Sequence, residues 1–263
     1  MTVLVHELKM NLKNFLIWFL SIAALCGGCI FLFPVVKDSM KEMSDSYANM
    51  GGFSAAFGLD KLSLATIEGF FATEIGTMYA LGAAMYAALL GIGMFSKEEV
   101  WHTSEFLHTL PLGRNSIITS KLGAGVILLT FFDLLNFLIF LFSFIGIGEK
   151  VDIKPIAVYM LVQYIMHLEV AVICFAISAL SKRNQSGAGL GLVLILYMLD
   201  LISRITDKME KLKYATPFYY SNSSDIIGNA GEVNGSLLLI AGLMITLCIA
   251  AVYTVYGRRD LAA

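Results

Sequence analysis

The sequence predicts an all-α integral membrane protein with six transmembrane helices. Charged residues make up 14% of the chain, whereas a soluble domain contains about 25%. Apolar runs of the length that crosses a bilayer, about 20 residues, recur along the chain between polar segments. The formal net charge of −2 gives no indication of a nucleic-acid partner. The lipid bilayer is therefore the first expected partner.

The chain begins with an amphipathic stretch. Leu4, Leu8 and Leu12 recur at helical spacing among polar residues, so residues 1–14 are expected to form a helix that lies flat at the membrane surface. The apolar run 15–36 follows. It exceeds the core of a cleavable signal, about 7–15 residues, and is therefore interpreted as the first span.

Five further spans and two outer segments complete a single transmembrane domain over residues 1–263. The spans are expected at 67–95, 116–144, 155–180, 187–203 and 236–256, with outer polar segments at 37–66 and 206–234. Six spans place both termini on one side of the membrane. Basic residues are denser in the short segments of that side, which favours a cytoplasmic location for both termini.

One polar interval, residues 97–112, is too short to cross the membrane. Its apolar positions Val100, Leu107 and Leu110 fall on one helical face, and Glu98 and Glu105 fall on the other. A proline after Leu110 disfavours further helix there. The interval is therefore predicted to be a short amphipathic helix on the cytoplasmic side, between the second and third spans.

No pattern for nucleotide or metal chemistry is present in the sequence. The glycines of 187–191 lack the lysine and hydroxyl residue with which a P-loop holds phosphate and magnesium. His167 and Glu169 are two residues apart and so point to different faces of a helix. No His-Glu-x-x-His frame accompanies them, so neither a catalytic residue nor a metal site is predicted.

Polar residues lie near the middle of two spans: Asp133 and Asn136 in the third, His167 and Glu169 in the fourth. A charged side chain at mid-membrane costs about 2.5–3.5 kcal/mol on insertion scales, so such residues face a bundle interior or a wet cavity. Two interpretations stay open: they line a substrate path or relay protons, or they pair with one another and fix the packing. Glu74 and Asp200, near span ends, favour the packing interpretation.

A local pattern joins the second span to the third. It reads Glu98-Glu99, then Glu105-Phe106-Leu107, then Leu110-Pro111-Leu112-Gly113-Arg114, with Lys121 in the third span. Together with the amphipathic start, the six spans and the outer Ala215–Tyr220 segment, it resembles the ABC-2 type permease family over essentially the whole chain. The chain has Trp101-His102-Thr103 where many members have Gly-Thr after the acid.

The resemblance implies that residues 97–112 are a coupling helix that docks into a separate ABC ATPase subunit, present in two copies. The residues assigned to this contact are Glu98, Glu99, Trp101, Glu105, Phe106, Leu107, Pro111 and Arg114. The acids are expected to meet basic residues of the ATPase, with Trp101 or Phe106 as apolar anchor. The chain itself needs no cofactor, because the partner binds ATP and Mg²⁺.

The function predicted on this basis is the permease subunit of an exporter in a bacterial cytoplasmic membrane, paired with a second copy or a paralogue. Methionines adapt to varied apolar partners, which favours a hydrophobic or amphipathic substrate, above all a toxin-like or antimicrobial peptide. The alternative is a proton-coupled carrier that uses Asp133, His167 and Glu169. The sequence shows no internal repeat of the kind from which many such carriers are built.

Overall fold

The computed structural model describes residues 2–48, 51–52, 54, 58–59, 61–100, 113–180, 185–205 and 207–258. Within these ranges the chain is helical apart from short turns, and no strand is assigned. Six helical segments are long and apolar enough to cross a membrane. The predicted all-α membrane fold with six candidate spans is confirmed at this level.

The elements follow one another along the chain with short helices at one end of the bundle. The candidate spans are α1 (Thr2–Ala48), the run of α3 (Ile67–Phe70), the π-helix η1 (Phe71–Ile75) and α4 (Gly76–Val100), then α6 (Arg114–Ile147), α7 (Ile153–Leu180), α8 (Ser186–Ile205) and α11 (Gly235–Arg258). Between α8 and α11 lie the 3₁₀-helix η2 (Asp207–Tyr214), α9 (Pro217–Tyr220) and α10 (Ser223–Gly228).

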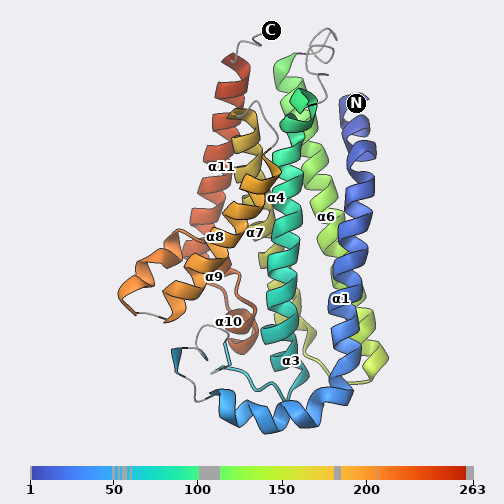
Figure 1. Ribbon diagram of the computed structural model, residues 1–263, viewed down its shortest axis with the longest axis vertical. Coiled ribbons are helices and arrows are strands. Elements are labelled where there is room, and N and C mark those ends of the chain that lie inside the picture. The colour runs from blue at the N-terminus through green and yellow to red at the C-terminus, as the bar shows by residue number, and fades with distance from the viewer. Residues whose placement is uncertain are drawn as a thin grey trace.

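The centre of the bundle is the pair α4 and α7. Of the most apolar window in each span, 67% is buried in α4 and 61% in α7, against 17% in α11. Figure 1 shows α4 in the middle, with α1 and α6 beside it and α8 crossing in front of α7. Gly91 permits the close approach of α4 and α7, because a Cβ at this position would lie 2.1 Å from the carbonyl oxygen of Ala171.

The end of α6 and the starts of α9 and α10 follow local sequence signals. Gly148 ends α6 in the left-handed conformation, at φ 70°, which glycine adopts without a steric penalty. Thr216 caps α9 by accepting a hydrogen bond from the Phe218 amide, and Pro217 occupies the first helical position. Asn222 caps α10 in the same way, through the amide of Asp225.

Helix α1 differs from the expectation at both ends. The residues predicted as a separate interfacial helix, 1–14, are the first turns of α1 from Thr2 on, because Glu7 is drawn into the bundle by two lysines. The helix also continues past 36, into the expected outer segment. Figure 1 shows it bend and then run across the end of the bundle, and Pro34 accounts for the bend. Lys37 ties this arm to Glu149 at 2.6 Å.

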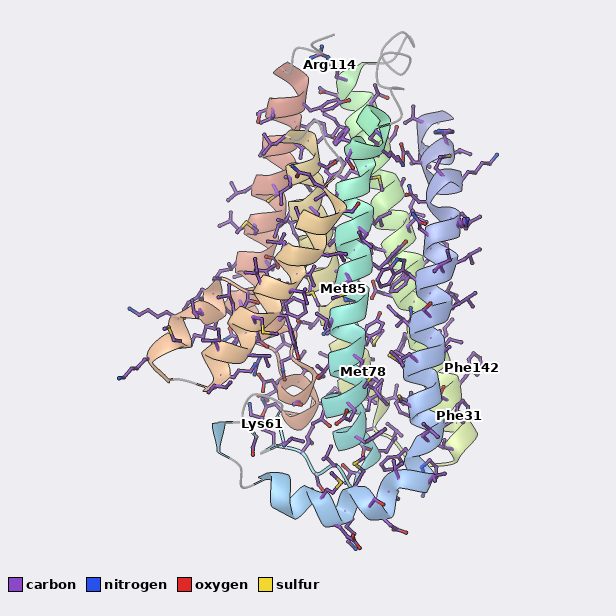
Figure 2. The ribbon with its side chains drawn as sticks, viewed as in Figure 1. Phe31, Lys61, Met78, Met85, Arg114 and Phe142 are labelled. Atoms are coloured by element: carbon purple, nitrogen blue, oxygen red, sulfur yellow. The ribbon has the colours of Figure 1, made fainter. Side chains whose placement is uncertain are left out.

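The start of α1, the end of α4, the start of α6 and the end of α11 lie at the same end of the bundle (Figure 1). Arg114, labelled at the top of Figure 2, marks this end, and Lys61 lies near the opposite one. We call them the terminal end and the short-helix end. The described residues at the outer faces include large apolar side chains such as Phe31, Phe142 and Ile145, as a bilayer would require.

Candidate functional site

Most of the predicted coupling segment lies outside the described residues. Residues 101–112 contain Trp101, Glu105, Phe106, Leu107 and Pro111, so nothing is said of their structure. Glu98 and Glu99 belong to the last turn of α4, and Arg114 begins α6 directly after Gly113. The structure therefore describes the two helices from which this segment starts and to which it returns.

A buried ionic cluster lies at the terminal end, where these two helices meet α1. We call it the Glu7 cluster: Glu7 of α1, Lys97 in the last turn of α4 and Lys121 of α6. Oε1 of Glu7 lies 2.7 Å from Nζ of Lys121, and Oε2 accepts a hydrogen bond from Lys97. Each carboxylate oxygen thus binds one lysine, and the two lysines belong to the two helices that flank residues 101–112.

Further contacts fix Lys121. Its ammonium donates to the carbonyl oxygen of Met94 at 2.6 Å and lies 5.4 Å from the centre of the Phe95 ring. Both acceptors are on α4, so Lys121 joins α6 to α4 as well as to α1. Asn11, one turn after Glu7, donates to the Glu7 carbonyl oxygen at 2.8 Å. The three helix ends are therefore held together by charge-assisted bonds.

Burial makes the Glu7 cluster energetically sensitive. The side chains of Glu7 and Lys121 are 1% and 0% exposed, and that of Lys97 is 16% exposed. A buried pair is roughly balanced between attraction and desolvation, but removal of one partner leaves an uncompensated charge and costs about 3–5 kcal/mol. Such a cluster contributes less to net stability than to fixing which helix ends lie against one another.

A second polar cluster lies inside the bundle, between α4, α6 and α7. Asp133 of α6 accepts a hydrogen bond from the hydroxyl of Tyr79 on α4, and its Oδ1 lies 2.8 Å from Nδ1 of His167 on α7. The rings of Tyr79 and His167 pack edge to face at 5.6 Å between centroids. All three side chains are buried. The predicted polar positions Asp133 and His167 thus do meet.

Several atoms of this region have no hydrogen-bond partner among the described residues: Asp133 Oδ2, His167 Nε2, Asn136 Oδ1, Gln163 Oε1 and the Tyr86 hydroxyl. The Asn136 amide donates to the Phe132 carbonyl oxygen of its own helix at 2.9 Å. A buried polar atom without a partner is costly, and more so in lipid. With Nδ1–H directed at Asp133, the Nε2 atom of His167 is left as a hydrogen-bond acceptor without a donor among the described residues.

Glu169 is placed apart from this cluster. Its Oε2 accepts a hydrogen bond from the hydroxyl of Tyr220 on α9 at 2.7 Å. Burial, followed by the neighbouring Glu169 carboxyl, raises the pKa of Tyr220. The contact attaches the short helix α9 to α7. The separation of Glu169 from His167 follows from their spacing of two residues on one helix.

A third ionic group lies at the short-helix end. Arg204 of α8 binds Asp200 at 2.9 Å and Asp225 of α10 at 2.8 Å, and donates to the Tyr219 carbonyl oxygen at 3.0 Å. Lys61 also binds Asp225. Burial raises the pKa of Asp225, but the adjacent charges of Arg204 and Lys61 outweigh it and hold that pKa below its ordinary value. Asp200, for which the sequence favoured a packing role, is bound by this arginine.

A small, partly open pocket adjoins this group, between α4, α8 and the short helices. Its lining mixes aromatic and polar side chains: Thr77, Ala80, Tyr197, Asp200, Leu201, Phe218, Ser221, Asn222 and Ser223. Of these residues the sequence analysis considered Asp200 and, within the Ala215–Tyr220 segment, Phe218, and none of the four predicted polar positions lines the pocket. Pro217–Tyr220, part of the outer segment noted in the sequence, forms α9 at its edge.

Sequence reasoning missed the Glu7 cluster. It interpreted Glu7 as part of the polar face of an interfacial helix, and the cluster joins residues 90 and 114 positions apart. No local spacing marks such a contact. The Asp200–Arg204 pair did leave a signal, since opposite charges four residues apart on a helix are neighbours.

Fold and site together define a multi-pass helical membrane protein with polar clusters inside the bundle and at both its ends. The family model described as "ABC-2 family transporter protein" matches residues 1–261. The chain therefore belongs to the ABC-2 transporter family, whose permeases are membrane subunits that are not normally catalytic themselves. A search of the curated proteins found no significant match.

Proposed function

We propose that this chain is the permease subunit of an ABC exporter in a bacterial cytoplasmic membrane, with both termini in the cytoplasm. The observation that supports this most is the Glu7 cluster, which joins the two helices that flank residues 101–112 at buried, charge-assisted contacts. When the ATPase displaces residues 101–112, two helices that are bonded to each other transmit the displacement to the bundle. Two independent helices would instead take up much of the displacement as local movement.

In this proposal a separate ATPase binds and hydrolyses ATP with Mg²⁺, and two ATPase copies serve two permeases, either identical or paralogous. Residues 97–112 dock into the ATPase. Glu98, Glu99 and Glu105 meet basic residues there, Trp101 or Phe106 is the apolar anchor, and Leu107, Pro111 and Arg114 shape the helix and its exit. Movement of the segment reaches α4, which passes it on through its close packing against α7.

The proposed substrate is a hydrophobic or amphipathic molecule, above all a peptide of the toxin or antimicrobial type. The small pocket at the short-helix end brings Tyr197 and Phe218 together with polar side chains, so its lining has both apolar and polar parts. A panel of amphipathic peptides should contain at least one that raises ATP hydrolysis by the reconstituted pair. If none of the panel does so, the peptide assignment is wrong.

The coupling assignment is tested by Glu99→Arg together with Phe106→Ala. In proteoliposomes that contain permease and ATPase, these changes should abolish the stimulation of ATP hydrolysis by the permease. Lys150→Glu is the matched control, since it reverses an exposed charge in the α6–α7 loop at the other end. Stimulation that survives both changes would remove residues 97–112 from the ATPase contact.

A second candidate function is proton-coupled transport, which the buried Asp133–His167 contact favours. Glu169, the third member of the predicted relay, is bonded to Tyr220 instead. A carrier of this kind would transport without an ATPase and would stop when an uncoupler collapses the proton gradient. An exporter would transport under the uncoupler as long as ATP is supplied.

A further inference from the structure

The Glu7 cluster divides one carboxylate between the two helices that flank residues 101–112. Oε2 of Glu7 binds Lys97, three residues before α4 ends, and Oε1 binds Lys121, seven residues after α6 begins. A relative shift of these two helix ends must therefore break one of the two bonds or carry Glu7 along. Because Glu7 and Lys121 are at most 1% exposed, water does not readily replace a broken bond.

Helix α1 extends from this cluster along the whole bundle. It is continuous from Thr2 to Ala48 and, after the bend at Pro34, it is ion-paired again through Lys37 and Glu149. The two attachments differ in strength. Lys37 and Glu149 are 43% and 33% exposed, and pairs of this kind contribute little. The firm ionic attachment of α1 among these two is thus the one at Glu7.

We propose that Glu7 is a positioning residue for residues 101–112, and that the N-terminal part of α1 belongs to the machinery that transmits movement from this segment to the bundle. This inference rests on the proposed function. It assigns to α1 a role that a helix merely anchored in the membrane would not have: when the ATPase displaces the segment, the α4 and α6 ends move as one unit with the α1 start.

The test compares three permease variants, each purified with the ATPase and reconstituted. Glu7→Gln keeps the shape of the side chain and removes its charge. Glu7→Met with Lys97→Met and Lys121→Met replaces all three charged members of the cluster by apolar side chains, so that no lysine of the cluster is left buried without the carboxylate that it binds in the wild type. Lys9→Gln is the control, since it removes an exposed charge from the adjacent turn. The readouts are ATP turnover with and without permease, the KM for ATP, co-purification and the melting temperature of the permease.

Glu7→Gln should lower permease-stimulated turnover by about fivefold or more, the lower range of coupling between distant sites. The KM for ATP and co-purification should stay unchanged, and Lys9→Gln should behave as the wild type. The triple variant should regain the melting temperature but not the stimulation, because α1 is no longer bonded to the ends of α4 and α6. A purely structural role of Glu7 predicts that the stimulation returns together with the melting temperature.

Two results would overturn the inference while leaving the proposed function intact: full stimulation by Glu7→Gln, or recovery of stimulation in the triple variant. A different result overturns the proposed function itself, and the inference with it. In that case the wild-type permease does not stimulate its ATPase at all, and Glu99→Arg with Phe106→Ala has no stimulation to remove.

Discussion

Nζ of Lys121 lies 2.7 Å from Oε1 of Glu7, with the lysine fully buried and the carboxylate 1% exposed. Helix α6 is thereby bonded to α1, and Lys97 extends the contact to α4. The energetics of this relationship are testable apart from any transport activity.

Glu7→Met should destabilise the protein by about 3–5 kcal/mol, because it leaves the ammonium groups of Lys97 and Lys121 without the carboxylate that both bind. Combination with Lys97→Met and Lys121→Met should recover most of this loss, since the three charges of the cluster are then removed together. The free energy of unfolding of the purified protein in detergent measures both effects. Lys9→Met, at an exposed position of α1, should change it by no more than about 0.5 kcal/mol. A larger loss in the triple variant than in Glu7→Met would contradict the account.

The contacts of Asp133 with Tyr79 and His167 predict that mutations of these residues affect stability in a coupled way. Tyr79→Phe removes a hydroxyl that donates to Asp133, so its cost should disappear once Asp133→Ala has been introduced. A double-mutant cycle on unfolding free energies should give an interaction energy of about 0.5–3 kcal/mol.

The control for this cycle is Tyr164→Phe, which removes a hydroxyl that contacts Thr130 at 2.9 Å on the exposed side of α6 and α7. Its cost should add to that of Asp133→Ala without interaction. Equal interaction energies for Tyr79 and Tyr164 would show that the cycle reports general packing rather than the bond to Asp133.

The ion pairs of Arg204 at the short-helix end predict that the stability of the folded protein changes at acid pH. The pKa of Asp225 is lowered in the folded protein. Its contribution to stability is therefore fully present above the unfolded pKa, about 3.9, and is lost as the pH falls through the folded pKa. The contribution of Asp225 should therefore stay constant from neutral pH down to about pH 5 and decline in stronger acid.

Asp225→Asn isolates this effect. The difference in melting temperature between wild type and variant should be constant over the neutral range and should shrink at acid pH, where the wild-type carboxyl is protonated. A difference that grows on acidification would mean that Asp225 has a raised pKa in the folded protein.

Two glycines on α4 provide a matched test of packing in the centre of the bundle. Gly91→Ala would bring a Cβ within 2.1 Å of the Ala171 carbonyl oxygen and force α4 and α7 apart, at a cost of about 1–3 kcal/mol. Gly93→Ala meets no atom within 4 Å and should be neutral or stabilising by up to about 1 kcal/mol through helix propensity. Comparable losses in both variants would place the effect in the helix rather than in its contact with α7.

Hydropathy predicted the six candidate spans because long apolar runs report directly on the membrane. It could not predict the continuity of α1. The polar residues 1–14 have the periodicity of an interfacial helix, and only the distant lysines at 97 and 121 draw Glu7 into the bundle. Similarly, the residues after 36 look like a loop in composition, whereas Met40 packs against the core.

The candidate site was predictable only where the argument was local. The spacing of His167 and Glu169 indicated different faces, and the structure gives them different partners. That Asp133 would meet His167 was one of two open interpretations, because their contact depends on how α6 and α7 lie against each other. The coupling residues between 101 and 112 stay a prediction, since they lie outside the described part of the chain.

The most direct test of the central claim is to locate residues 101–112 relative to the membrane. Glu105→Cys and Glu232→Cys are each introduced into a chain whose four cysteines have been replaced, and intact cells are treated with a membrane-impermeant thiol reagent. Glu232 lies in the segment predicted to be outside the cell, so its cysteine should be labelled in intact cells, while the cysteine at 105 should react only after the membrane is opened. Labelling of position 105 from outside intact cells would contradict the proposed coupling to a cytoplasmic ATPase.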